Sequence, residues 1–184
     1  MTDTTGVSDD TSALTVRTPG DLLEAIPYLL GFRPRDSLVI VGLADTRVTV
    51  TARVDLSELG DGAVLAETMC VLGNSEATQV IAAVYDDTSS GLVKQALPHR
   101  AMVDVFAGCA ARFGIDVVDA VLVCAGRWWS YACADDACCP DEGRELPGDA
   151  SPARAAATYA GLVALADRDE LAALLEPADA AERA

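Results

Sequence analysis

The sequence has few basic residues and no long apolar run, and each shortage excludes a class of function. Among its 184 residues, 13 are Lys or Arg and 29 are Asp or Glu, which gives a formal net charge of −16. Such a field repels nucleic-acid phosphates and anionic lipids, and no basic cluster offsets it locally. No apolar run approaches the roughly 20 residues that a membrane-spanning helix needs. We therefore expect a protein that binds neither nucleic acids nor membranes.

Several catalytic motifs are also missing. The sequence contains no P-loop, no dinucleotide-binding glycine fingerprint and no HExxH segment. Ser130 lacks the small flanking residues of a nucleophile elbow and His99 is the only histidine, so an acyl-transfer triad is not supported. The acidic first residues lack the apolar segment of a secretory signal. We expect a cytoplasmic protein whose cysteines are thiols or metal ligands.

The apolar pattern predicts a single α/β domain. Helices alternate with very apolar strands, which predicts a mixed, mostly parallel sheet of about five strands with one β-hairpin, helices on both faces and two C-terminal helices. We expect a disordered tail over residues 1–12, the domain over 13–176 and a frayed end over 177–184. The strands are expected at residues 14–17, 37–42, 47–56, 79–85 and 116–125, the second and third forming the hairpin.

Capping signals predict where the helices begin. Thr18 and Asp21 form a box-like pair at the start of a helix that ends at Gly31. Pro27 lies inside this helix and is expected to kink it or to limit it to two turns. The other helices are expected at residues 60–72, up to about 113 with a division at Pro98, at 151–166, and from an Asp167–Glu170 capping box to about 176.

The segment with the least regular pattern is Gly126–Gly143, GRWWSYACADDACCPDEG, which we call the Trp/Cys loop. It contains both tryptophans, three of the six cysteines and an arginine, and it has neither helical nor strand periodicity. It directly follows the last predicted strand, and ligands of α/β sheets usually bind beyond the carboxyl ends of strands. The Trp/Cys loop is therefore the first candidate for a functional site.

Three segments together resemble the actinobacterial family called domain of unknown function 4192. They are PYLLGFRPRDSLVIVGL (27–43), ARVDL (52–56) and the Trp/Cys loop, which is the most specific of the three. The resemblance covers about residues 14–176 and implies a bacterial cytoplasmic domain, but it assigns no roles. Arg33 and Arg35 occupy positions that are expected to vary. The matching positions are Tyr28, Gly31, Pro34, Asp36, Ser37, Arg53, Asp55, Arg127 to Tyr131, Cys133, Cys138, Cys139 and Pro140.

Cys133, Cys138 and Cys139 place three thiols close together in the sequence, which is the ligand density of a metal site. A zinc ion would need a fourth ligand, and His99, Cys124 or a local carboxylate are the candidates. The neighbouring acidic residues attract a cation, and they are expected to raise the pKa of the thiols and so to disfavour a nucleophilic thiolate. The alternatives to a metal site are a local disulfide, packed thiols, catalysis and a redox switch.

The aromatic and basic residues of the Trp/Cys loop have two interpretations each. Trp128 and Trp129 are expected to point in different directions. They either pack on the sheet end and the last helices or, with Tyr131, bind a planar or cationic ligand or a protein partner. Arg127 either binds a carboxylate or phosphate or forms an ion pair with Asp55 or Asp36.

The preferred hypothesis is a ligand- or protein-binding module whose Trp/Cys loop forms the recognition surface, with a metal ion as a staple. A second hypothesis is an enzyme acting on a small anionic metabolite, with Arg53 and Arg127 as clamps and Asp55 or Asp36 as the acid or base. It requires one pocket that holds Arg53, Asp55 and Arg127 within reach of one another. A third hypothesis is a thiol redox switch at the three cysteines.

Overall fold

A computed structural model describes residues 18–45, 47–60, 62–89, 92 and 94–175. The predicted strand at 14–17 and the two predicted tails therefore lie outside the described residues. The strands are β1 (Ser37–Ala44), β2 (Arg47–Asp55), β3 (Gln79–Tyr85), β4 (Asp116–Cys124), β5 (Arg127–Ser130) and β6 (Arg144–Glu145). The α-helices are α1 (Pro19–Leu30), α2 (Gly62–Asn74), α3 (Arg100–Arg112), α4 (Pro152–Tyr159) and α5 (Arg168–Leu175).

The six described strands form one mixed sheet in the order β2-β1-β3-β4-β5-β6. It is mostly antiparallel, so the prediction of a mostly parallel sheet was wrong. The predicted β1–β2 hairpin is present, but β3 also runs antiparallel to β1, and β5 pairs antiparallel with both β4 and β6. The pairing of β3 with β4 is the parallel one. Apolar runs report burial on both faces of a sheet, and burial does not fix the direction of the neighbouring strand.

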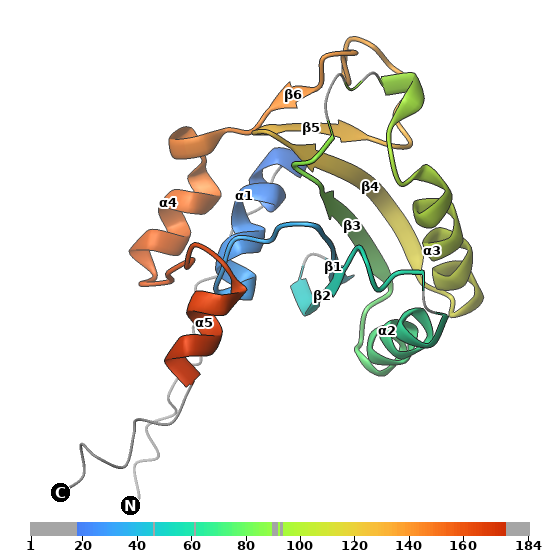
Figure 1. Ribbon diagram of the computed structural model, residues 1–184, viewed down its shortest axis with the longest axis horizontal. Helices are drawn as coiled ribbons and strands as arrows, with labels where there is room; N and C mark the ends of the chain where they lie inside the picture. Colours follow the sequence, from blue (N-terminus) through green and yellow to red (C-terminus); the bar gives the residue numbers. More distant parts are fainter. Residues whose placement is uncertain (1–17, 46, 61, 90–91, 93, 176–184) are drawn as a thin grey trace, which may run out of the picture.

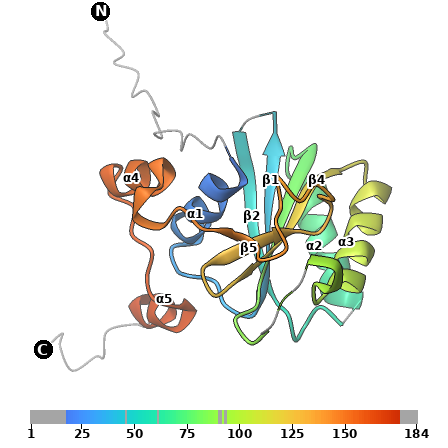
Figure 2. The same ribbon diagram turned by 90° about the horizontal axis from the view of Figure 1, so that it is seen from above.

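Helices cover both faces of the sheet, as predicted. Figure 1 shows α2 and α3 on one face and α1, α4 and α5 on the other, and Figure 2 shows the same layers from above. Alternate residues of the strands enter two separate cores, one with α2 and α3 and one with α1. None of the described helices is both long and apolar enough to cross a membrane.

Helix α1 begins with the predicted capping box, in which Asp21 N–H donates to the Thr18 side chain and Thr18 N–H donates to Asp21. The helix continues through Pro27 to Leu30 and ends at Gly31 as predicted, so of the two expected effects of Pro27 the limit to two turns is not seen. Proline cannot donate to the carbonyl four residues earlier, which belongs to Leu23. The buried hydroxyl of Tyr85 donates a long hydrogen bond (3.5 Å) to this carbonyl. The sheet thus supplies the donor that Pro27 lacks.

The Trp/Cys loop is not wholly irregular, because its first residues form β5. Ala125 and Gly126 have φ values of 48° and 76°, which is the positive-φ pair of a two-residue type I′ hairpin turn. The register then pairs Val123 with Trp128 and Leu122 with Trp129. Adjacent strand residues point to opposite faces, so the two indoles enter different cores.

The two C-terminal helices are present, but the first is shorter than predicted. Helix α4 ends at Tyr159, and Gly161, at a φ of 77°, turns the chain away. The chain then returns to the end of α1, where Arg33 N–H donates to Leu165 O (3.0 Å) and Leu165 N–H donates to Gly31 O (2.9 Å). One half of the predicted capping box of α5 is present, since Asp167 accepts the N–H of Glu170 at 2.9 Å, whereas the Glu170 carboxylate accepts the N–H of Ala166 (2.8 Å).

Gly143 is the residue at which a methyl group should be most damaging. It has a φ of +73°, and a Cβ would lie 2.6 Å from Cζ2 of Trp129. We expect Gly143→Ala to lower the free energy of unfolding by about 2–4 kcal/mol, from backbone strain and overpacking together. Gly148→Ala is the matched control, because Gly148 also has a positive φ (+56°) but open space around it. Urea unfolding followed by circular dichroism measures both. Equal losses in the two variants would contradict a role for the Trp129 contact.

Candidate functional site

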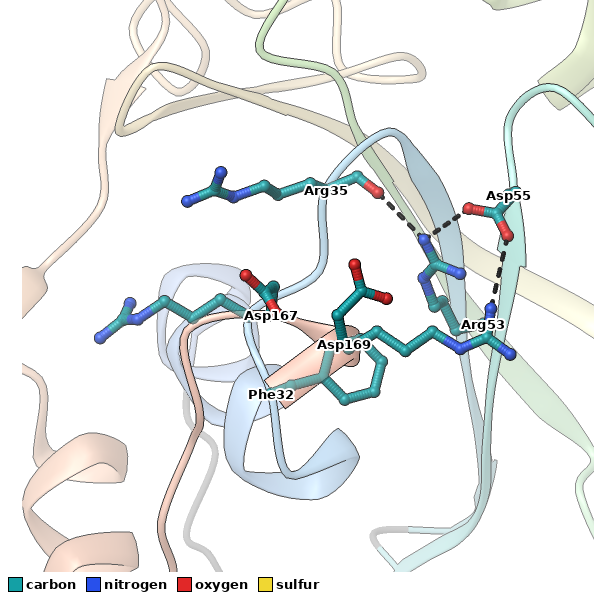
Figure 3. Close-up of a pocket in the computed structure, with 8 residues that line it drawn as sticks. Phe32, Arg35, Arg53, Asp55, Asp167 and Asp169 are labelled. Atoms are coloured by element: carbon teal, nitrogen blue, oxygen red, sulfur yellow. Dashed lines mark hydrogen bonds and ion pairs between the residues drawn. The ribbon is translucent and has the colours of Figure 1, made fainter. Parts of the chain in front are cut away.

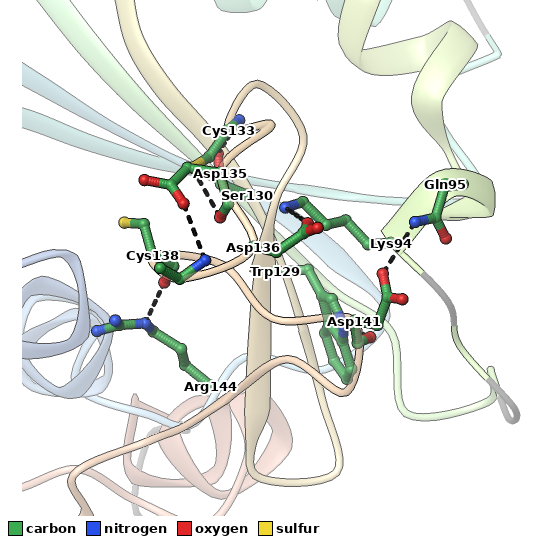
Figure 4. A network of polar contacts seen from close by, with 11 residues as sticks. Lys94, Gln95, Trp129, Ser130, Cys133, Asp135, Asp136, Cys138, Asp141 and Arg144 are labelled. Atoms are coloured by element: carbon green, nitrogen blue, oxygen red, sulfur yellow. Dashed lines mark hydrogen bonds and ion pairs between the residues drawn. The ribbon is translucent and has the colours of Figure 1, made fainter.

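Three thiols of the Trp/Cys loop converge, with the sulfur atoms of Cys133, Cys138 and Cys139 all within 4.8 Å of one another. The sequence indicated this cluster, and the folded segment between β5 and β6 brings the three sulfur atoms together. All three are free thiols, of which Cys139 is buried, Cys133 half-buried and Cys138 exposed. Figure 4 shows Cys133 and Cys138 among the polar residues that surround the cluster.

Ser130 positions the first of these cysteines. Its hydroxyl donates to Asp119 Oδ1 (2.8 Å) and accepts the N–H groups of Ala132 (3.2 Å) and Cys133 (3.1 Å). Burial raises the pKa of Asp119. Ser130 is therefore the centre of a turn that directs the chain from β5 into the thiol cluster, which gives it a positioning role.

The other end of the Trp/Cys loop is fixed by backbone carbonyls. The N–H of Cys139 donates to Asp135 O (2.7 Å), and Trp129 Nε1 donates to Asp141 O (2.9 Å). Arg144 Nε donates to the carbonyl of Cys138 (Figure 4). These bonds fix the backbone on both sides of Cys138 and Cys139, so the cluster is held by the chain itself.

The electrostatics of the cluster differ from the prediction that acidic neighbours raise the pKa of every thiol. Burial raises the pKa of Cys139 to about 12. The pKa of Cys133 is lowered instead, by a hydrogen bond from Cys139 and, more weakly, by the ammonium group of Lys94. Lys94 lies beside the thiols and forms an ion pair with Asp136 (Nζ to Oδ1, 3.0 Å). The hydrogen bond from Cys139 is thus the main cause of the lowered Cys133 pKa, and a cation that is distant in sequence adds to it.

The two distant candidates for a fourth metal ligand are engaged elsewhere. His99 Nε2 lies 2.7 Å from Asp86 Oδ2, and the thiol of Cys124 donates to Ser89 O at 3.4 Å. Among the described residues, neither belongs to the cluster of converging ligand atoms. A fourth position would therefore fall to a local carboxylate, to water or to a bound ligand.

The structure does not bring Arg127 to Arg53 and Asp55. Arg53 lies on β2 and pairs with Asp55 (2.6 Å), whereas Arg127 lies on β5 and pairs with Glu145 (2.8 Å). Three strands separate β2 from β5, a distance of roughly 19 Å at normal strand spacing. The common clamp that the enzyme hypothesis requires is not formed, and the pairing of Arg127 with Asp55 or Asp36 was also wrong.

The aromatic candidates are all buried, with 6% of Trp128, 5% of Trp129 and 7% of Tyr131 exposed. The Tyr131 hydroxyl donates to Pro98 O (2.8 Å), and Arg100 lies over the Tyr131 ring. The three aromatic side chains are therefore packed in the interior, and a role for them in binding a ligand stays a prediction.

A cleft of about 570 Å³ separates the Trp/Cys loop from the start of α1. Thr18 and Gly20 line one side, and Cys138 and Arg144 line the other, with Trp128 also in its wall. Cys138, the exposed cysteine of the cluster, thus lines a cavity large enough for a ligand or a short peptide segment.

Sequence reasoning missed the contact between Asp86 and His99. Asp86 follows β3 directly, and its buried carboxylate also accepts from Thr88 N–H (2.9 Å), Thr88 Oγ1 (2.6 Å) and Ser89 Oγ (2.9 Å). Burial opposes ionisation, but these bonds and His99 outweigh it and hold the pKa of Asp86 well below its usual range. The Asp-x-Thr-Ser pattern after the strand was a signal for a hydrogen-bonded turn, but nothing in the sequence linked it to His99.

These features define a mixed α/β domain with a three-thiol loop that connects the last two strands of its described sheet. A family model described as Domain of unknown function (DUF4192) matches residues 19–184. The chain belongs to this family, as the three sequence segments indicated. Comparisons with curated proteins and with solved structures found no match.

The Asp86 turn gives a pH-dependent prediction. Because its folded pKa is lowered, Asp86 stabilises the protein above its unfolded pKa of about 3.9, and this stabilisation is lost as pH falls through the folded pKa. We expect Asp86→Asn to cost about 1–3 kcal/mol at pH 7 and progressively less below about pH 4. Urea unfolding of the wild type and the variant, at pH 7 and below about pH 4, measures this difference in the free energy of unfolding. Asp104→Asn, at an exposed position of α3, is the charge control. A deficit that did not shrink in acid would contradict this account.

Proposed function

We propose that the three thiols bind one thiophilic metal ion, most simply Zn²⁺, and that this ion staples the Trp/Cys loop into a recognition surface for a ligand or protein partner. The observation that carries the proposal is the convergence of three sulfur atoms within 4.8 Å. Two thiolates on one tetrahedral zinc ion are about 3.8 Å apart, given Zn–S bonds of about 2.3 Å. The cluster is therefore close to the spacing that a zinc ion would impose.

The chemistry of the ligands also supports this proposal. Thiolates favour zinc and other soft metals over magnesium and calcium. Three aspartates near the cluster in sequence, Asp135, Asp136 and Asp141, add negative charge that attracts a cation. None of their carboxylates belongs to the group of converging ligand atoms, so one of them would have to move to fill a fourth position. Displacement of thiol protons accompanies metal binding, so metal affinity should fall in acid, and the raised pKa of Cys139 adds to the cost of deprotonating that thiol at neutral pH as well.

The recognition surface is supported by the position of Cys138. This residue belongs to the thiol cluster and also lines the 570 Å³ cleft beside α1. A metal ion held by Cys138 would fix one wall of that cleft. The lining of the cleft also carries two arginines and two glutamates, so it favours neither sign of charge and offers polar contacts to a partner; they are Arg127, Arg144, Glu142 and Glu145.

A redox switch is the second candidate, and the mutual proximity of three free thiols favours it. One thiolate would attack a peroxide, which gives a sulfenic acid and one water after protonation. A second thiol would then displace the sulfenic oxygen as another water to form a disulfide. The net reaction oxidises two thiols and reduces one peroxide to two waters.

Elemental analysis and thiol titration of the reduced, purified protein separate these functions. We expect one zinc ion per chain, lost in Cys138→Ser and retained in Cys70→Ser, which alters an equally exposed cysteine outside the cluster. Metal-free wild-type protein with six reactive thiols would contradict the metal proposal. In that case, loss of two thiols after mild peroxide, abolished by Cys133→Ser, would support the switch, and an unchanged thiol count would exclude it.

A further inference from the structure

A second cleft lies beside β2, at the opposite end of the strand order from the Trp/Cys loop. It has a volume of about 210 Å³ and is formed by the segment after α1, by β2 and by the start of α5 (Figure 3). Four arginines line it, namely Arg33, Arg35, Arg53 and Arg168. The sequence has 13 basic residues, of which Lys94 is the only lysine, so one third of the 12 arginines gather at this cleft.

The charges of the cleft favour an anion. Three aspartates also line it, so its formal charge is +4 − 3 = +1, in a chain whose net charge is −16. Asp55 is engaged by Arg53 at 2.6 Å and lies 3.9 Å from Arg168, and Asp167 accepts the N–H of Glu170. Arg33 and Arg35 form no ion pair within the part of the chain that the structure describes. Their guanidinium groups are therefore available to an external anion.

Arg53 is held in place before any ligand binds. Its Nη2 donates to Asp55 Oδ1 and to Arg35 O (3.2 Å), and its side chain is only 14% exposed (Figure 3). Its buried Nε has no acceptor among the described residues, which leaves one N–H donor unsatisfied although Asp55 balances the charge. An oxyanion within reach of this Nε would supply the missing acceptor.

The walls of the cleft are joined by backbone hydrogen bonds. Arg33 N–H donates to Leu165 O (3.0 Å), which ties the segment after α1 to the chain that enters α5. Leu56 N–H donates to Asp36 O (2.9 Å), which ties the same segment to the end of β2. A site whose walls are already joined loses less conformational entropy on binding than one that must form around its ligand.

We infer that this cleft binds a small molecule through a carboxylate or phosphate group that is contacted by arginines of its lining. Guanidinium groups match both oxyanions with paired N–H donors. The volume suits a small metabolite and is below the usual size of sites for larger ligands. The ring of Phe32, which also lines the cleft, provides an apolar wall for the carbon skeleton. The inference is independent of the metal proposal, because the two sites share no residue.

Asp169 provides a sharp test, because its carboxylate lines the same cleft and would repel the bound oxyanion. An anion site predicts that Asp169→Asn tightens binding severalfold. A network of arginines that only stabilises the fold predicts no such gain. Arg168→Gln and Arg33→Gln should weaken binding about tenfold each, the loss of one charge-assisted contact. Both arginines are exposed, so these variants are expected to fold.

Isothermal titration of the full chain with inorganic phosphate and, separately, with succinate measures these effects. Saturable 1:1 binding of either probe supports the inference, and the tighter probe identifies the preferred group. Arg47→Gln is the matched control, since it removes one exposed charge from β2 outside the cleft. The inference is overturned if neither probe saturates, or if Arg47→Gln weakens binding as much as Arg168→Gln. A repeat with chelator-treated protein should give the same affinity, which separates this result from the metal proposal.

Discussion

The two-residue turn between β4 and β5 is the constraint on which the rest of the structure depends. Its positive-φ pair, Ala125 and Gly126, reverses the chain at once and sets the register of β5. That register sends Trp128 into the core with α1 and Trp129 into the core with α2 and α3. Trp129 in turn holds the Trp/Cys loop through Asp141. The position of the thiol cluster therefore follows from a turn that contains none of its residues.

The sequence predicted the elements whose signals are local. The Thr18–Asp21 box, the division at Pro98 and the buried strands each depend on a few neighbouring residues. Strand direction was not predictable, because burial on both faces is compatible with either direction. The β4–β5 hairpin was missed because Ala-Gly lacks the Asn-Gly or Asp-Gly pair that usually identifies a type I′ turn.

In the candidate sites too, residues that are close in sequence were predicted to meet, and residues that only the fold brings together were not. The three cysteines are close in sequence, and their convergence was predicted. Asp119 lies on the sheet and Lys94 lies in the segment before α3, and only the fold brings them to the Trp/Cys loop. No spacing in the sequence therefore connects either residue to the loop. The arginine cleft depends on the return of the chain from α4 to the end of α1, and no pattern predicts that return. Arg53 and Asp55 were the members of the cleft that the sequence singled out as candidate site residues.

The hydrogen bond from Tyr85 to Leu23 has a consequence for how the family can vary. The hydroxyl occupies a carbonyl that an ordinary residue at position 27 would claim with its own N–H. A relative with phenylalanine at position 85 would leave that buried carbonyl without a donor unless position 27 were no longer proline. The two positions are distant in sequence, yet we expect phenylalanine at position 85 to occur together with a residue other than proline at position 27. Replacement of Tyr85 before Pro27 passes through a less stable intermediate sequence, whereas the reverse order does not, because a carbonyl oxygen can accept two hydrogen bonds.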